Sequence, residues 1–256
     1  MRFASIGSGS EGNGLVVEQG ATRILIDCGF GVRDAAARLE RAGITPESLT
    51  AIIVTHEHSD HVGGVPAFAA KHRIPVWLTF GTLEIVGERF AGMERIYGFD
   101  SHDRIPIGDL EVRPFPVPHD AREPVQFVVS DGAWRLGVVT DLGTTTRYVE
   151  MSLSGCDALV LECNHDLDML ERSDYPVSLK QRISGRFGHL HNEGAAALLA
   201  ALDTTRLQHI VAAHLSKQNN TPDMARAALA GALGCGADWI GIADQVHGFD
   251  WRTLGA

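Results

Sequence analysis

Short apolar runs recur along the 256-residue chain, and their length and β-branched content are typical of buried strands. Apolar residues at helical spacing separate many of these runs, and a glycine such as Gly43 often ends the predicted helix. The predicted strands span residues 2–6, 15–18, 23–27, 51–54, 75–78, 110–115, 125–130, 134–139, 158–161, 210–212 and 239–242. The predicted helices span residues 32–42, 61–71, 82–90, 148–152, 192–202 and 222–233, whereas residues 165–190 are polar and show little core pattern.

The order of these elements suggests two halves, each of which builds a sheet with helices outside it. No low-complexity linker divides the chain. We therefore expect a single α/β domain over residues 1–256, folded as a four-layer α/β/β/α sandwich. Histidines and aspartates follow several of the predicted strands, so we expect a functional site at one edge of the sheets.

The composition is ordinary for a globular protein, with 45% hydrophobic and 21% charged residues. No apolar run approaches the length of a membrane span, and no secretory signal is visible after Met1. The cysteines (Cys28, Cys156, Cys163 and Cys235) lack CxxC spacing, which favours reduced core residues. We therefore expect a cytoplasmic protein with no membrane partner. The net charge of −10 disfavours nonspecific attraction to nucleic acid, so a polyanion needs a local basic patch and bound metal ions.

The densest cluster of metal-binding residue types is the HxHxDH segment, residues 56–61, directly after the strand predicted at 51–54. Its members His56, His58, Asp60 and His61 suit a borderline metal ion. His56 and His58 are two apart and can grip one ion from the same side, whereas Asp60 and His61 lie in the following turn and face a second ion. Gly63 and Gly64 then permit close backbone approach under the metals. A polar loop with chance histidines is the less favoured alternative.

Three later residues each end an apolar run: His119, Asp141 and His214. A single histidine at a strand end is more often a polar cap than a ligand. Three such segments in succession favour the ligand interpretation.

The order HxHxDH, then His, Asp and His, resembles the ligand order of the metallo-β-lactamase superfamily, which implies the same four-layer sandwich. By that resemblance, His56, His58 and His119 hold one divalent ion, Asp60, His61 and His214 hold the second, and Asp141 bridges the two. Two ions a few ångströms apart need a shared anion, which Asp141 and a bridging hydroxide supply. The histidines suit zinc, whereas the carboxylates and a phosphate substrate also suit manganese.

Further segments resemble the WalJ/YycJ-like branch of this superfamily, whose members resemble DNA exonucleases. The segments are residues 8–13, 162–166, 175–176 with 179–183, 188–193 and 214–220. The resemblance implies that Asp60 and His189 are catalytic. It implies that substrate contacts come from Ser10, Asn13, Asn164, Lys180, Arg182 and Asn192. Two residues depart from the branch pattern, because His191 and Cys163 stand where serine is expected.

Two features near these segments leave alternatives open. The glycine-rich segment 7–14 can expose backbone N–H groups to a phosphate, but a plain hairpin loop explains it equally well. The basic run Lys180, Arg182 and Arg186 offers phosphate contacts beside His189, although a solvated face explains it about as well.

The sequence thus predicts a dinuclear metal-dependent phosphodiester hydrolase that degrades nucleic acid, DNA rather than RNA, from an end in the 5′–3′ direction with a metal-bridging hydroxide. The alternatives are an RNA-processing nuclease, a phosphodiesterase for small or cyclic nucleotides, and a thioester or lactam hydrolase. A metal-binding protein without turnover is disfavoured, because a structural site closes with four ligands.

Overall fold

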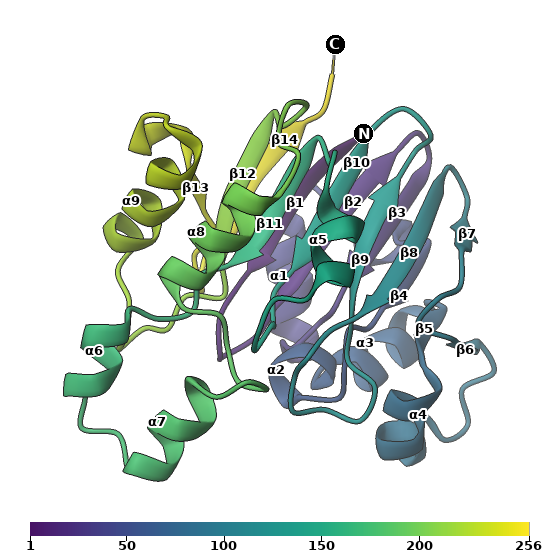
Figure 1. Ribbon diagram of the computed structural model, residues 1–256. Coiled ribbons are helices and arrows are strands. Elements are labelled where there is room, and N and C mark those ends of the chain that lie inside the picture. The colour runs from purple at the N-terminus through teal and green to yellow at the C-terminus, as the bar shows by residue number, and fades with distance from the viewer. Residues whose placement is uncertain (256) are drawn as a thin grey trace.

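Two seven-stranded β-sheets packed face to face form the centre of the computed structural model, which describes residues 1–255 (Figure 1). In spatial order the first sheet contains β14 (Phe249–Thr253), β1 (Arg2–Gly7), β2 (Gly14–Gln19), β3 (Thr22–Ile26), β4 (Ala51–Ile53), β5 (Val76–Thr79) and β6 (Ile96–Phe99). The second contains β13 (Gly241–Ile242), β12 (His209–Ala213), β11 (Ala158–Glu162), β10 (Arg135–Val139), β9 (Val125–Ser130), β8 (Leu110–Pro116) and β7 (Ile105–Ile107).

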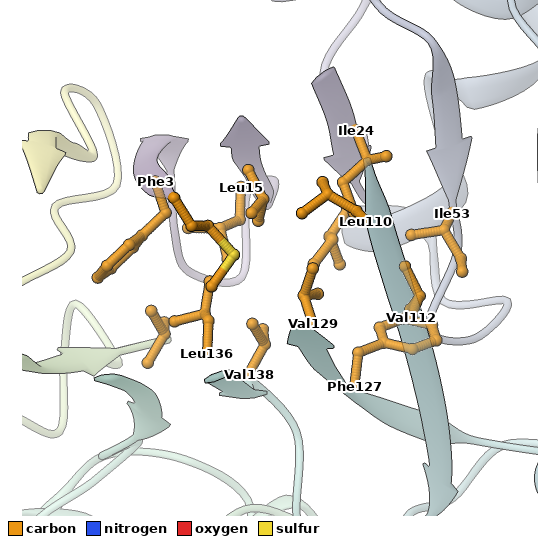
Figure 2. Packing of buried hydrophobic residues seen from close by; sticks show 14 of the residues in the cluster. Phe3, Leu15, Ile24, Ile53, Leu110, Val112, Phe127, Val129, Leu136 and Val138 are labelled. Carbon is orange, nitrogen blue, oxygen red and sulfur yellow. The ribbon is translucent and has the colours of Figure 1, made fainter. Parts of the chain in front are cut away.

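The central core lies between the two sheets. Figure 2 shows Phe3, Leu15 and Ile24 of the first sheet facing Val129 and Val138 of the second. Successive strand residues point to opposite faces, so the neighbours of these residues pack on the outer side of each sheet. Because both faces of the inner strands are buried, those strands are continuous apolar runs rather than alternating ones.

Helices cover the outer face of each sheet, which confirms the four-layer α/β/β/α architecture (Figure 1). The first sheet is covered by α1 (Val32–Arg41), α3 (Val65–His72) and α4 (Phe80–Val86), whose buried side chains include Leu39, Phe68 and Val86. The second sheet is covered by α5 (Arg147–Leu153), α8 (Asn192–Ala201) and α9 (Pro222–Leu233).

The helix predicted over residues 61–71 is two helices, α2 (Ser59–Val62) and α3. The chain is interrupted at Gly63 and Gly64, because the backbone of Gly64 passes directly under the loop that precedes α1. A Cβ atom at position 64 would lie 1.8 Å from the carbonyl oxygen of Phe30, so only glycine fits. A close backbone approach is thus observed at Gly64, against the loop at Phe30.

Residues 165–190 are not irregular as predicted, because they contain α6 (Leu167–Arg172) and α7 (Val177–Ile183). These two short helices stand apart from the layers, at the lower left of Figure 1. Leu170 is buried in α6, and no residue of α7 is buried among those described. With one buried residue in α6 and none in α7, core-facing periodicity is too weak for the sequence pattern to reveal these helices.

Other boundaries also differ from the sequence-based predictions. The helix predicted over residues 82–90 is α4 followed by the 3₁₀ helix Gly87–Phe90, and Pro46–Ser48 forms another 3₁₀ turn. The strand predicted over 239–242 is shortened to β13 by a third 3₁₀ turn, Ala237–Trp239. Strands β6, β7 and β14 were not predicted, and β14 returns the chain to the first sheet by pairing with β1. All four cysteines are free, and none of the described helices is long and apolar enough to cross a membrane.

Candidate dinuclear metal centre

The predicted ligands meet at one edge of the sandwich, where several strands end. His56 and His58 follow β4, and the helix α2 that comes next carries Asp60 and His61. The second sheet supplies His119 after β8, Asp141 after β10 and His214 after β12. Because β10, β11 and β12 are parallel, their carboxyl ends share one edge and bring these side chains together.

The first group of ligands consists of three imidazoles whose nitrogen atoms converge. Nε2 of His56 and Nε2 of His119 lie 3.0 and 3.2 Å from Nδ1 of His58. Nδ1 of His119 donates to the carbonyl oxygen of Gly188 at 2.9 Å, which leaves Nε2 free as a ligand atom. Burial lowers the pKa of both His56 and His119, so these imidazoles are neutral and ready to bind a cation.

The second group brings together Asp60, His61 and His214. Oδ2 of Asp60 lies 3.3 Å from Nε2 of His214 and 3.4 Å from Nε2 of His61. Behind His61, the fully buried Asp27 accepts a hydrogen bond from Nδ1 at 2.8 Å, and the backbone N–H of Thr55 also donates to Asp27. These contacts orient the ring of His61 with Nε2 toward the centre.

Asp141 lies between the two groups. Its Oδ2 atom is 2.8 Å from Nε2 of His61, and its Oδ1 atom is 4.0 Å from Nε2 of His119. Oδ2 is buried and accepts no hydrogen bond from any described residue. Once His61 is deprotonated, its remaining proton lies on Nδ1 against Asp27, and the lone pair of Nε2 then faces this carboxylate. Two acceptors in contact fit a shared cation, and the residues present therefore suit bound metal.

In the metal-free chain the second group is an ion-paired cluster. Burial alone would lower the pKa values of His61 and His214, but Asp141 and the other nearby carboxylates raise them well above their usual range. Burial acts to raise the pKa of Asp141, yet His214 and His61 hold it well below its usual range. Metal uptake at this group must therefore displace protons.

Glu162, at the end of β11, lies beside the second group of ligands and contacts His189 and His214. It is fully buried, and its Oε1 atom accepts from Nδ1 of His189 at 2.7 Å and lies 3.5 Å from Nδ1 of His214. Its Oε2 atom accepts the backbone N–H groups of Leu142 and Leu190. Burial opposes protonation of His189, but Glu162 and Asp141 raise its pKa to about 9. His189 therefore carries a proton at neutral pH in the metal-free chain.

His191, one of the two departures from the branch pattern, caps helix α8. Its Nδ1 atom accepts the backbone N–H of Gly194 at 3.1 Å, which is the role that a serine performs at an N-cap. The substitution thus keeps the local structure, and His189 alone of the two histidines lines the cleft described next. The other departure, Cys163, is a fully buried thiol whose pKa is raised by burial.

A cleft of about 270 Å³ opens beside His189. Its lining contains three of the predicted substrate-binding residues, Ser10, Asn164 and Arg182. Nε of Arg182 donates to Oδ2 of Asp120 at 2.7 Å. Lys180, a fourth predicted contact, does not line the cleft, and its Nζ atom donates to the carbonyl oxygen of Glu171.

The two remaining predicted contacts, Asn13 and Asn192, are buried. The side-chain amide of Asn13 donates to the carbonyl and carboxylate oxygens of Asp60 at 3.3 Å each, so this residue holds a ligand in place. The side-chain amide of Asn192 exchanges two hydrogen bonds with that of Asn220. Neither side chain is free to contact a substrate, because burial and existing partners occupy both.

The glycine-rich segment 7–14 connects β1 to β2 as a hairpin loop. Several of its N–H groups already have partners: Gly9 donates to Asn13, Glu11 to Gln245 and Gly12 to Gly9. The hydroxyl of Ser8 accepts the N–H of His214, whose φ of 54° needs such support.

Three acidic residues of the site were not predicted from the sequence: Asp27, Asp120 and Glu162. Asp27 and Glu162 follow or end apolar strands, as Asp141 does, so the same strand-end rule could have found them. Asp120 directly follows a predicted ligand, His119.

A family model for the beta-lactamase superfamily domain matches residues 22–210. Exodeoxyribonuclease YycJ of Bacillus anthracis is 33% identical over 252 residues, which cover 98% of this chain and 96% of that protein. Exodeoxyribonuclease WalJ of Streptococcus pneumoniae is 30% identical over 255 residues, covering 96% and 93%. The crystal structure of the metallo-beta-lactamase fold protein YhfI from Bacillus subtilis shares the fold, with a TM-score of 0.76, 16% identity and 98% coverage of each chain.

Proposed function

The chain belongs to the metallo-β-lactamase superfamily, in the branch of the exodeoxyribonucleases YycJ and WalJ, and from this premise we propose that it removes nucleotides from an end of DNA. It is a metal-dependent hydrolase of the nuclease and phosphodiesterase class. The observation that carries the finer proposal is the position of a carboxylate, Asp141, between two groups of converging ligands beside a cleft that contains an arginine. The 5′–3′ direction of degradation is proposed from the family resemblance alone.

The chain is proposed to hold two divalent ions, one by His56, His58 and His119 and one by Asp60, His61 and His214, with Asp141 shared. When bound, such ions lower the pKa of a water molecule and neutralise charge on a phosphoryl oxygen. The ligand chemistry suits zinc or manganese.

The remaining steps are assigned to side chains of the protein. Asp60 keeps about a fifth of its side chain exposed (20%), so it can accept a hydrogen bond from the attacking water and orient it. When the phosphorus–oxygen bond of the ester breaks, the leaving oxygen needs a proton. His189 supplies it from Nε2, because Nδ1 is engaged by Glu162 and the side chain is partly open to the cleft. Arg182 binds the phosphate, and Ser10 contributes a polar contact. Asn164 also lines the cleft, but it is buried and its amide donates to the carbonyl oxygen of His214.

A substrate panel tests this function. Metal-free protein is reloaded with zinc or manganese and offered DNA and RNA of one sequence, labelled at either end, together with a cyclic dinucleotide and a β-lactam. We expect stepwise release of nucleotides from the 5′ end of DNA, with slower turnover of RNA. Internal cleavage, or hydrolysis of only the lactam, would contradict the proposal.

A second candidate function is hydrolysis of a small or cyclic nucleotide. The size of the cleft favours it, since about 270 Å³ lies near the lower end of ligand pockets, which span about 300–1,000 Å³. Turnover of the cyclic dinucleotide at a kcat/KM above that of every DNA substrate would support this candidate instead.

A further inference from the structure

The cleft beside the metal centre has two chemically different walls. One wall contains the hydroxyl residues Ser10 and Ser216, beside the buried Asn164. The other comes from the segment that carries α7 and contains Tyr175 together with Leu179 and Ile183. Figure 1 shows that α7 stands outside the four layers, so this wall is not part of either core.

The apolar wall follows from the spacing of its residues. Leu179 and Ile183 are four apart on α7 and therefore share one face. Tyr175 lies just before the helix, ahead of its N-cap Pro176, and lines the same cleft. All three side chains are half-buried, and all three line the cleft. Segments of this size normally bury their apolar face against the core, whereas α7 contributes no buried residue in the described chain. Its apolar face is directed to the cleft instead.

Charge at the cleft is also localised. Among the described lining residues, Arg182 is the only one with a permanent positive charge. Its Nε atom is engaged by Asp120, and its other N–H donors have no hydrogen-bond acceptor in the part of the chain that the structure describes. A guanidinium with free donors at the rim of a metal centre suits a phosphate oxygen.

These three features match the three parts of one nucleotide. The aromatic and aliphatic wall suits the base, the arginine suits the phosphate, and the wall with hydroxyl groups suits the sugar. We propose that this cleft takes a single unpaired terminal nucleotide of the substrate, with its base stacked on the ring of Tyr175. The inference rests on the proposed exonuclease function and adds to it a contact with the terminal base. A stacked base is sequence-tolerant, because every base has a π-face.

The proposed stacking of the base on Tyr175 is tested by combining substitutions of Tyr175 with removal of the terminal base from the substrate. Single-stranded DNA with an ordinary terminal nucleotide is compared with the same DNA ending in an abasic nucleotide, for the wild type, Tyr175→Ala and Tyr175→Phe. We expect the wild type and Tyr175→Phe to prefer the ordinary end by roughly 5- to 150-fold in kcat/KM, the range for one base–aromatic stack. Tyr175→Ala should lose this preference, mainly through KM.

Val177→Ala is the matched control, because Val177 lies two residues away, is 70% exposed and does not line the cleft. It should keep the wild-type preference. A merely structural defect in Tyr175→Ala would slow both substrates equally, and that result would overturn the inference. Equal defects in Tyr175→Phe and Tyr175→Ala would also overturn it, because they would assign the effect to the hydroxyl group.

A binding measurement without turnover tests the base contact independently of the proposed exonuclease activity. Calorimetry compares deoxyadenosine monophosphate with deoxyribose 5-phosphate on the metal-loaded protein. If the wild type binds the nucleotide more tightly than the sugar phosphate and Tyr175→Ala does not, the base contact is supported. This holds even if no labelled DNA is degraded; absence of degradation would refute only the proposed exonuclease function. Equal binding of the two compounds to the wild type would overturn the stacking inference whatever the nuclease assay shows.

Discussion

At the scale of single residues, a partner behind the ring orients two candidate ligands and His189. Asp27 fixes His61, the carbonyl oxygen of Gly188 fixes His119, and Glu162 lies behind His189. Each partner accepts the Nδ1 proton, which leaves Nε2 toward the centre or the cleft. Such partners commonly change metal affinity by about 10- to 100-fold.

Asp27→Asn should weaken the second ion and spare the first. The carboxylate of Asp27 accepts hydrogen bonds from both Thr55 and His61. An asparagine has only one side-chain oxygen acceptor, so it cannot accept both in the same way. Asp27 has a φ of 60°, and asparagine tolerates this left-handed conformation, so the backbone should be unchanged. We expect the affinity for the second ion to fall by about 10- to 100-fold in metal titration, with the first unaffected. Asp34→Asn, on the surface of α1, is the control, and equal losses at both ions would contradict the assignment.

His189→Ala and His191→Ala should separate catalysis from helix capping. We expect His189→Ala to retain both ions and to lose at least about two orders of magnitude in kcat, as loss of a general acid implies. His191→Ala should instead lose about 1 kcal/mol of unfolding free energy, which His191→Ser restores, because a cap is removed and replaced. Metal analysis, kcat and urea unfolding distinguish the two. A metal-depleted or nearly active His189→Ala would refute its role.

Much of the candidate site was predictable at this scale, because ligand types at strand ends are visible in the sequence. All seven predicted ligands are gathered by the fold into the two groups and the shared Asp141. Their supporting contacts were not predictable. Asn13 and Asn192 have the residue type of substrate contacts, but only the structure shows that Asp60 and Asn220 occupy them.

At the scale of elements, α7 turns one pair of basic residues in different directions. Arg182 and Lys180 are two apart, so they cannot share a face of the helix. Arg182 lines the cleft, whereas Lys180 donates to the carbonyl oxygen of Glu171. The sequence presented both as one basic run, and the helix that separates them was hidden by its lack of a buried face.

Arg182→Ala should therefore weaken nucleic-acid binding, and Lys180→Ala should not. Loss of one phosphate contact is expected to flatten the plot of log affinity against log salt by about one unit. The measurement is a titration of single-stranded DNA at several salt concentrations with metal-loaded protein. Lys180→Ala serves as the control, since it removes the same charge from the same helix. Equal slopes for the two variants would show that neither contacts phosphate.

At the scale of the whole molecule, the centre joins the two sheets. The first sheet supplies His56 to His61, and the second supplies His119, Asp141 and His214. The layered fold was predictable because continuous apolar strands and amphipathic helices follow one another in order. Edge strands were harder to predict: β6, β7 and β14 pair at the borders of the sheets and have mixed burial, so their apolar signal is weak.

Because both sheets contribute ligands, metal removal should destabilise the whole fold. A ligand at 100 times its Kd adds about 2.7 kcal/mol, which raises Tm by about 5–10 °C for a chain of this size. We expect chelation to lower Tm by this order and zinc or manganese to restore it. Asp141→Ala is the control, and its Tm should respond much less because the shared ligand is lost.

The gain in Tm on metal loading should also grow with pH. In the metal-free chain the pKa values of His61 and His214 are raised, mainly by Asp141 against the opposing effect of burial. The stability from these ion pairs is fully present below the ordinary histidine pKa of about 6.5 and is lost as pH rises through the raised values. Metal binding needs the same nitrogens deprotonated, so its apparent affinity rises over that range. In calorimetric scans from about pH 6 upward, the difference in Tm between the metal-loaded and metal-free protein should increase with pH. Parallel curves would mean that these histidines do not exchange protons for metal.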